Sequence, residues 1–316
     1  MFGMKYLIFI STILIFSAVG LPARVKSETE YLKNGKSVEN TLGVTNAGAR
    51  YVLDSSVSCM KDGANKIFDL GSRVIKLWFT YNPKATYPYN CDWNKWNINN
   101  CVDLAQTDYY SEVFDMDFRT FVLETHTFDY TKNSLHVSWE DGMSGEECSR
   151  LEDEMYKLTK YLMIRYNGKN KEFILQNWEG DNMLGCRQWR INTKNGYYYN
   201  VDEGIASANA TADSLIRVKI KGLTDWFNFR QKGVDKARKE LEEKSDVVVR
   251  HALEINFIYL DKKDEGWPYE DSPTILNNIV PYTDCDLYSL SSWGSKTIER
   301  ANTLQERLKI YETKLG

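Results

Sequence analysis

The chain has 316 residues, of which 27% are charged and 42% hydrophobic, with six cysteines and six prolines. This composition excludes an intrinsically disordered chain, a disulfide-dense miniprotein and a coiled coil. Forty Lys and Arg residues against 44 Asp and Glu residues give a formal net charge of −4, which leaves no basic field for nucleic acid. The 9 Trp and 20 Tyr residues fit a large packed core or a cleft in which sugars stack, and composition does not separate the two.

The first twenty residues predict a secretory signal peptide. Lys5 precedes an apolar run over residues 7–19, and Ala18 and Gly20 place small residues before a mature start at Leu21. The run is too short to cross a hydrocarbon core of about 30 Å at about 1.5 Å per residue. We therefore expect removal of residues 1–20 and a secreted, extracellular protein that makes no membrane contact after cleavage. An uncleaved membrane anchor is the alternative interpretation.

Export to an oxidising compartment predicts disulfides among the six cysteines. Cys91 and Cys101 enclose a short polar loop and form the pair that we predict, whereas the other four cysteines allow three pairings. No Cys-x-x-Cys motif occurs and the three histidines are scattered, so we expect no zinc site. Asn209 begins the only N-glycosylation motif of the sequence, and export of the chain would make this motif usable.

Apolar runs alternate with longer amphipathic stretches along the chain. The runs predict strands at Ala49–Leu53, Val74–Phe79, Thr120–Phe128, Glu172–Trp178, Val247–Tyr259 and Asp286–Ser291. The amphipathic stretches predict helices at Ser58–Leu70, Gly145–Tyr166, Leu215–Lys244 and Ser295–Leu315. This alternation indicates parallel strands joined by right-handed crossovers. No glycine-rich phosphate-binding motif occurs, so the pattern predicts an α/β fold of the (β/α) TIM-barrel type, with residues 21–316 as its single domain.

Polar side chains gather where the predicted strands end, which is where barrel enzymes carry their chemistry. Alternation along a strand places the two members of each of three pairs on one face: Glu124 with His126, Asn177 with Glu179, and Glu254 with Asn256. Three consecutive strands thus end in carboxylate, amide or imidazole groups. The sequence predicts one shared site at this rim.

The segment Asn177-Trp178-Glu179 resembles the end of the fourth strand in secreted glycoside hydrolases of the large (β/α)8 clan that includes cellulases and mannanases. The resemblance implies that Glu179 is the general acid/base and that Asn177 contacts the sugar 2-hydroxyl. It also implies supporting residues and stacking walls, at His126, His251, Tyr288, Trp178 and Trp293. The chain departs from the clan at Trp178, which separates the asparagine and the glutamate that are adjacent there.

The strand count bears on the second catalytic carboxylate. In the clan, the nucleophilic glutamate lies on the seventh strand, and we predict six strands. The barrel is therefore expected to be incomplete at its C-terminus, lacking the last one or two β/α units, unless an early strand escapes the pattern. Glycosidases hold two carboxylates about 5–5.5 Å apart when retaining and about 6.5–9.5 Å apart when inverting. Glu254 is the candidate partner of Glu179, with Asp181 behind it.

The same residues also have structural interpretations. Glu179 and Asp181 could cap the helix that follows their strand. Glu254 could pair with Arg250 or Arg217 inside the protein, and His126 could form a satisfied hydrogen-bonded pair with Glu124. We expect Trp78 to fill the core or pack under a loop.

Together these observations predict a glycoside hydrolase-like protein that cleaves a poly- or oligosaccharide with two carboxylates. The alternative is a non-catalytic secreted protein that binds glycans through the same cleft. A third hypothesis, a secreted hydrolase of ester bonds, is disfavoured because no Gly-x-Ser-x-Gly motif occurs. We expect a carbohydrate as the only partner, a monomer, and neither a metal nor an organic cofactor. The sugar, the linkage and the stereochemical outcome stay open.

Overall fold

The structure is a computed structural model, and it describes residues 7–9, 42–46, 52–126, 128, 138–241, 244–257 and 272–291. The predicted helix Ser295–Leu315, the predicted wall residue Trp293 and most of the predicted signal peptide lie outside these residues. Within them, no helix has the combination of length and apolar character that a bilayer crossing requires.

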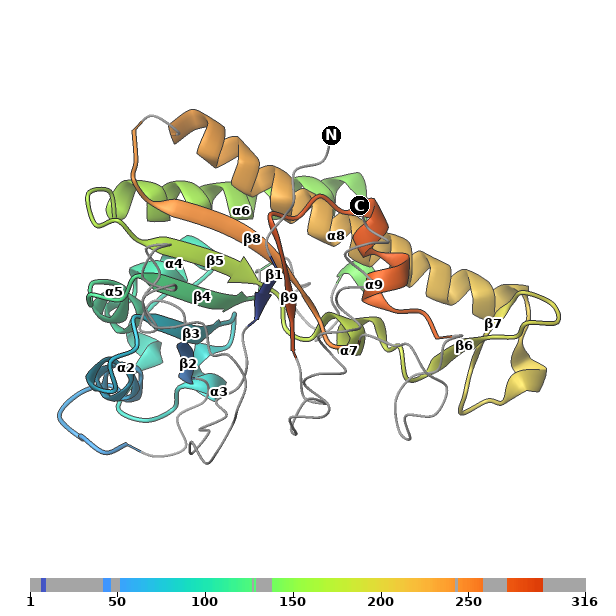
Figure 1. Cartoon of the computed structure of the whole chain (residues 1–316), viewed down its shortest axis with the longest axis horizontal. Helices are drawn as coiled ribbons and strands as arrows, with labels where there is room; N and C mark the ends of the chain where they lie inside the picture. Colours follow the sequence, from blue (N-terminus) through green and yellow to red (C-terminus); the bar gives the residue numbers. More distant parts are fainter. Residues whose placement is uncertain are drawn as a thin grey trace, which may run out of the picture.

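The fold is built on one parallel sheet (Figure 1). Its strands are β1 (Leu7–Phe9), β2 (Gly43–Asn46), β3 (Val74–Phe79), β4 (Thr120–Thr125), β5 (Glu172–Gln176), β8 (Val248–Ile255) and β9 (Leu287–Leu290). The strands from β2 to β9 follow one another across the sheet in chain order, and β1 pairs with the outer edge of β9. All neighbours are parallel, and the sheet curls as half of a barrel. The predicted α/β fold with parallel strands is confirmed.

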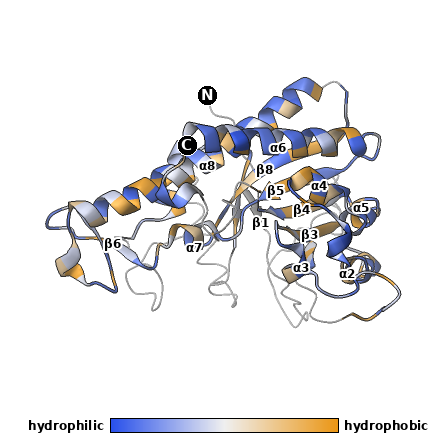
Figure 2. Cartoon of the chain, turned by 180° about the vertical axis from the view of Figure 1, so that it is seen from behind, coloured by the Kyte–Doolittle hydropathy of each residue, from blue (hydrophilic) through white to orange (hydrophobic). Residues whose placement is uncertain are grey.

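The helices are α2 (Cys59–Asp69), α3 (Pro83–Thr86), α4 (Cys101–Gln106), α5 (Asp108–Phe114), α6 (Gly145–Arg165), α7 (Gly180–Leu184), α8 (Ala210–Leu241) and α9 (Ile275–Asn278). Figures 1 and 2 show the two longest helices, α6 and α8, side by side across the sheet. A small antiparallel hairpin, β6 (Trp189–Ile191) and β7 (Tyr198–Asn200), lies beside the first half of α8 and away from the sheet.

Side-chain caps fix where the longer helices begin. The Ser58 hydroxyl accepts a hydrogen bond from the Lys61 N–H at the start of α2. Ser144 and Glu147 form a reciprocal capping box at the start of α6. The amide oxygen of Asn209 accepts the N–H groups of Thr211 and Ala212, so α8 begins five residues before the predicted Leu215.

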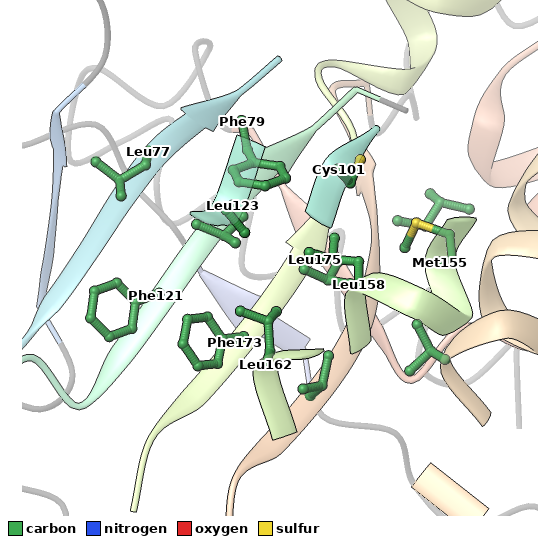
Figure 3. Packing of buried hydrophobic residues seen from close by; sticks show 14 of the residues in the cluster. Leu77, Phe79, Cys101, Phe121, Leu123, Met155, Leu158, Leu162, Phe173 and Leu175 are labelled. Atoms are coloured by element: carbon green, nitrogen blue, oxygen red, sulfur yellow. The ribbon is translucent and has the colours of Figure 1, made fainter. Parts of the chain in front are cut away.

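One face of the sheet, the helix face, carries the main core. Strand residues such as Leu77, Leu123 and Leu175 pack there against helix residues such as Leu158 and Leu162 (Figure 3). Every second residue of each strand points to the opposite face of the sheet. That face holds a small apolar layer of Val74, Val122, Ile174, Ala252 and Leu287. The sheet is therefore buried on both faces, but the large core lies on the helix face alone.

Two sequence predictions require correction. Val52 and Leu53 do not belong to a strand, because the Leu53 N–H donates to the Asp62 carboxylate in the segment that leads into α2. Among the described residues, the first strand after the signal region is β2 instead, at Gly43–Asn46. The strands of the sheet from β4 onward end one to four residues earlier than predicted: β4 ends at Thr125 rather than Phe128, and β8 ends at Ile255 rather than Tyr259.

The cysteines are not joined in the structure. The predicted Cys91–Cys101 disulfide is not formed, and no other pair of cysteines is at bonding distance. The Sγ atom of Cys91 instead lies 3.8 Å from the Sγ atom of Cys59.

Candidate functional site

Polar side chains form one group on the opposite face of the sheet, at the carboxyl ends of the strands. We define this rim cluster as Lys76 on β3, Glu124 and His126 at the end of β4, Gln176 on β5, Glu254 on β8 and Ser289 on β9. Strand pairing aligns them, since Glu124 is the partner of Gln176, and Glu254 is the partner of Ser289. The cluster therefore draws on five neighbouring strands.

Lys76 links the two carboxylates of the rim cluster. Its Nζ atom lies 3.5 Å from Oε2 of Glu124 and 3.7 Å from Oε1 of Glu254. Both glutamates are nearly buried, with 2% and 3% of their surface exposed. Burying carboxylates costs free energy unless a cation or hydrogen bonds compensate their charge. One ammonium group thus serves two acidic groups, and the three side chains carry a net negative charge when all are ionised.

Burial is the main influence on the pKa of Glu254. It raises the pKa of this carboxyl above its ordinary value, although Lys76 and a backbone N–H from Glu179 favour the ionised form. The neighbouring carboxylates of Glu124 and Glu179 push the pKa of Glu254 upward as well. Glu254 therefore keeps its proton to a higher pH than an exposed glutamate does.

Several buried polar atoms of the rim cluster make no hydrogen bond within the described part of the chain. They are both amide atoms of Gln176, Oε1 of Glu124, Nε2 of His126 and the hydroxyl of Ser289. His126 Nε2 comes within 3.6 Å of Glu124 Oε1, which is an ion-pair distance rather than a hydrogen bond. Because buried polar groups are normally paired, this concentration of unused donors and acceptors makes the rim cluster the candidate binding site among the described residues.

Two tryptophans border the rim cluster. The Trp78 ring is stacked on the His126 ring, with centroids 6.3 Å apart and an interplanar angle of 7°. The Trp178 ring lies 6.5 Å from the Trp78 ring, and 39% of Trp178 is exposed. An exposed indole face beside polar groups is a surface on which the apolar face of a sugar can stack.

Glu179 lies in the turn between β5 and α7, next to Glu254. Its backbone is left-handed, with φ 30°, and its N–H donates to Oε2 of Glu254 over 2.7 Å. Its half-buried side chain accepts a hydrogen bond from the Asn182 amide. A Cβ on the following residue, Gly180, would lie 2.5 Å from the backbone oxygen of Glu254, so this close approach requires glycine. The turn thus brings the two predicted catalytic residues together.

The side chains of three other predicted site residues accept hydrogen bonds from backbone N–H groups of the protein itself. Asn177 accepts the Glu254 N–H with its amide oxygen, and Asn256 accepts the Asp181 N–H in the same way. The Asp181 carboxylate accepts three backbone N–H groups, those of Asn256, Phe257 and Ile275. Burial raises the pKa of Asp181 to about 6. These contacts brace the turn that carries Glu179.

Two further predicted residues lie apart from the rim cluster. The Tyr288 hydroxyl donates to the Thr283 carbonyl. His251 is fully buried on the helix face, where its Nε2 accepts a hydrogen bond from Arg230 of α8. The predicted wall residue Trp293 is outside the described residues.

Neither arginine that was predicted as a partner of Glu254 contacts it in the structure. Arg250 pairs with Glu172 at the amino end of the sheet, and Arg217 pairs with Asp213 on α8. Lys76 is the cation beside Glu254. The arginine interpretation is therefore wrong.

The sequence reasoning missed four residues of this region, Lys76, Trp78, Gln176 and Ser289. Trp78 was expected in the core or under a loop but borders the rim cluster. A signal for Lys76 and Trp78 was present, because residues 74–79 alternate and Ile75, Leu77 and Phe79 take the apolar face. A lysine on the other face of a central strand was thus a candidate site residue.

Among the described residues, no group of three or more His, Cys, Asp or Glu side chains is arranged to hold a metal ion. A comparison with models of known protein families finds none that matches this chain, and a comparison with curated protein sequences finds no match either.

Proposed function

We propose that this chain is a glycoside hydrolase-like protein that binds a poly- or oligosaccharide at the rim cluster and cleaves it with Glu179 and Glu254. The observation that carries the proposal is the set of unpartnered buried polar atoms beside the exposed face of Trp178. Sugar hydroxyls both donate and accept hydrogen bonds, so they match a mixed set of amide, hydroxyl, imidazole and carboxylate atoms. We propose further that the curled sheet is part of a TIM-type (β/α) barrel, since its strands are parallel and follow chain order.

Charge favours a neutral ligand over an anionic one. Lys76, the cation at the centre of the rim cluster, already faces Glu124 and Glu254. A phosphate or carboxylate ligand would meet these two acidic groups as well as the ammonium. A sugar without charged substituents avoids this repulsion and still uses the hydrogen-bonding atoms.

The two carboxylates differ in a way that suits acid catalysis. Burial raises the pKa of Glu254, so this residue is the better proton donor to a departing glycosidic oxygen. Glu179 is half-buried, and it is the carboxylate that attacks the sugar or activates water. This assignment keeps the pair predicted from the sequence but exchanges the two roles.

The test compares variants on two kinds of substrate. Glu254→Gln is expected to lower the release of sugar from an unactivated oligosaccharide by about 10²–10⁴-fold, because the leaving oxygen is no longer protonated. The loss should be much smaller on a nitrophenyl glycoside, whose leaving group departs without a proton. Glu179→Gln should lower turnover of both substrates. The measurement is the initial rate on a panel of oligosaccharides and the matching nitrophenyl glycosides.

Glu172→Gln is the matched control. Glu172 lies on the same face of β5 as Gln176 of the rim cluster, but at the amino end of the strand, where it pairs with Arg250. It should leave turnover unchanged.

The activity of the unmodified protein should fall as pH rises through the raised pKa of Glu254, because only the protonated acid donates. Full turnover by Glu254→Gln on the unactivated substrate would reject the catalytic proposal. Glycan binding without any release by the unmodified protein would instead support the alternative, a binding protein.

A further inference from the structure

Cys59 and Cys91 form a close pair of thiols away from the rim cluster. Their Sγ atoms are 3.8 Å apart, although 32 positions separate them in the chain. Cys59 is the first residue of α2 and is buried, whereas Cys91 is partly exposed. The pair therefore has one accessible and one protected sulfur.

Backbone contacts hold the two segments in this arrangement. The Cys59 N–H donates to the Tyr89 carbonyl over 3.2 Å. The side chain of Asn90, which has a left-handed backbone, donates to the carbonyls of Ser55 and Val57. The two residues before Cys91 are thus tied to the start of α2 by hydrogen bonds that do not depend on the sulfur contact.

The environment also makes the two thiols unequal. The hydrogen bond from the Cys91 thiol lowers the pKa of Cys59, and backbone N–H groups at the start of α2 act in the same direction. Sharing that proton with Cys59 raises the pKa of Cys91. Cys59 is therefore the sulfur that carries the negative charge when the pair loses one proton.

We propose that Cys59 and Cys91 are a disulfide-forming pair, oxidised by exchange with a low-molecular-weight disulfide such as oxidised glutathione. Within the singly deprotonated pair, the partly exposed Cys91 passes its proton to Cys59 and attacks the external disulfide. This step forms a mixed disulfide and releases one glutathione thiolate, which takes the proton from Cys59. The Cys59 thiolate then attacks the Cys91 sulfur, and the second glutathione leaves. The two protein thiols are oxidised by two electrons, the glutathione disulfide is reduced to two thiols, and the two protons pass to the glutathione products.

The bond would fasten a segment that supports the rim. Tyr87, four residues before Cys91, donates its hydroxyl proton to the Asn46 carbonyl and accepts the Trp78 N–H. The Trp93 indole N–H in turn donates to the Tyr87 carbonyl. Oxidation would therefore lock the start of α2 to the segment that braces β2 and β3, and it should raise the melting temperature of the protein.

Peptide mapping of the full chain tests the pairing directly. The protein is incubated with oxidised glutathione, alkylated without reduction and digested with trypsin. A linked species of peptides 51–61 and 85–95, lost on reduction, is the expected result, because these peptides contain Cys59 and Cys91. A link between peptides 85–95 and 96–119 would show the Cys91–Cys101 pair instead and would overturn the proposal. Alkylation of both Cys59 and Cys91 after oxidation would overturn it too.

Variants provide a second readout. Cys59→Ser and Cys91→Ser should each abolish the rise in melting temperature on oxidation, and each should leave one more alkylated thiol than the oxidised unmodified protein. Cys186→Ser is the control, because Cys186 is buried after α7, and it should retain the rise. A rise that persists in both Cys59→Ser and Cys91→Ser would place the reactive pair elsewhere.

Discussion

Lys76 is the residue on which the electrostatics of the rim cluster depend. Its side chain is 12% exposed, and its ammonium lies between two carboxylates that are almost entirely shielded from water. Removing one member of a buried charge group leaves the others uncompensated, which usually costs more than the intact group contributed. The lysine is therefore required for burial of the acids, whatever its effect on a bound sugar.

Lys76→Met is expected to lower the free energy of unfolding at pH 7 by about 3–5 kcal/mol. The loss should shrink as pH falls, because the uncompensated glutamates can take up protons and become neutral. Urea denaturation at pH 7 and pH 5 measures both effects. Lys157→Met removes an exposed lysine paired with Asp153 on α6 and should change stability little at either pH. An equal loss at both pH values would contradict the role given to Lys76.

The site residues that were predicted incorrectly show that a pattern within one segment does not contain the register between strands. Alternation paired Glu124 with His126 and Glu254 with Asn256, and the structure places Glu124 and Glu254 together beside Lys76 in the rim cluster. It also favoured Asn177, but β5 ends at Gln176, and strand pairing places Gln176 beside Glu124. Register between strands is set by packing across the whole sheet, so it cannot be deduced from one segment.

At the scale of elements, length decided which helices were predicted at all, although the longest helix, α8, begins five residues before its predicted start. The long helices α2 and α6 were predicted within one residue at each end, because their apolar spacing and their caps agree. The short helices α4 and α5 have too few turns to show a helical period, and they were missed. A prediction from periodicity therefore describes the framework better than the connections that shape the rim.

Close packing of α8 against α6 depends on small residues, and this can be tested at Gly233. A Cβ there would lie 2.4 Å from the Glu152 carbonyl oxygen on α6. Gly233→Ala should lower the free energy of unfolding by about 1–3 kcal/mol, even though alanine favours a helix by about 1 kcal/mol over glycine. Thermal or urea unfolding measures the change. Ser214→Ala on the exposed side of α8 should be neutral or slightly stabilising; a stabilising Gly233→Ala would show that the two helices separate easily.

At the scale of the whole molecule, the two faces of the sheet serve different purposes. The helix face carries a continuous core that includes residues of every long helix. The opposite face has one thin apolar layer, with the pair Glu172 and Arg250 on its amino side and the rim cluster on its carboxyl side. Alternation of strands and helices predicted an α/β fold of the TIM-barrel type, and its parallel strands are confirmed. The difference in packing between the two faces of the sheet was not predicted.

This division predicts different costs for two neighbouring residues of β5. Leu175 belongs to the main core and is fully buried, whereas Ile174 faces the thin layer with 3% exposed. Leu175→Ala should lower the free energy of unfolding by about 2–5 kcal/mol, because the surrounding core cannot collapse into the cavity. Ile174→Ala loses a similar volume where few apolar neighbours pack, so it should cost at least about 1 kcal/mol less.

Urea unfolding of the two variants and the unmodified protein measures the difference, and both variants should keep the far-ultraviolet circular dichroism of the parent. Because the two side chains share a strand, differences in backbone propensity largely cancel. Equal costs would mean that the face carrying the rim cluster is packed as firmly as the helix face, which would contradict the division between the two faces.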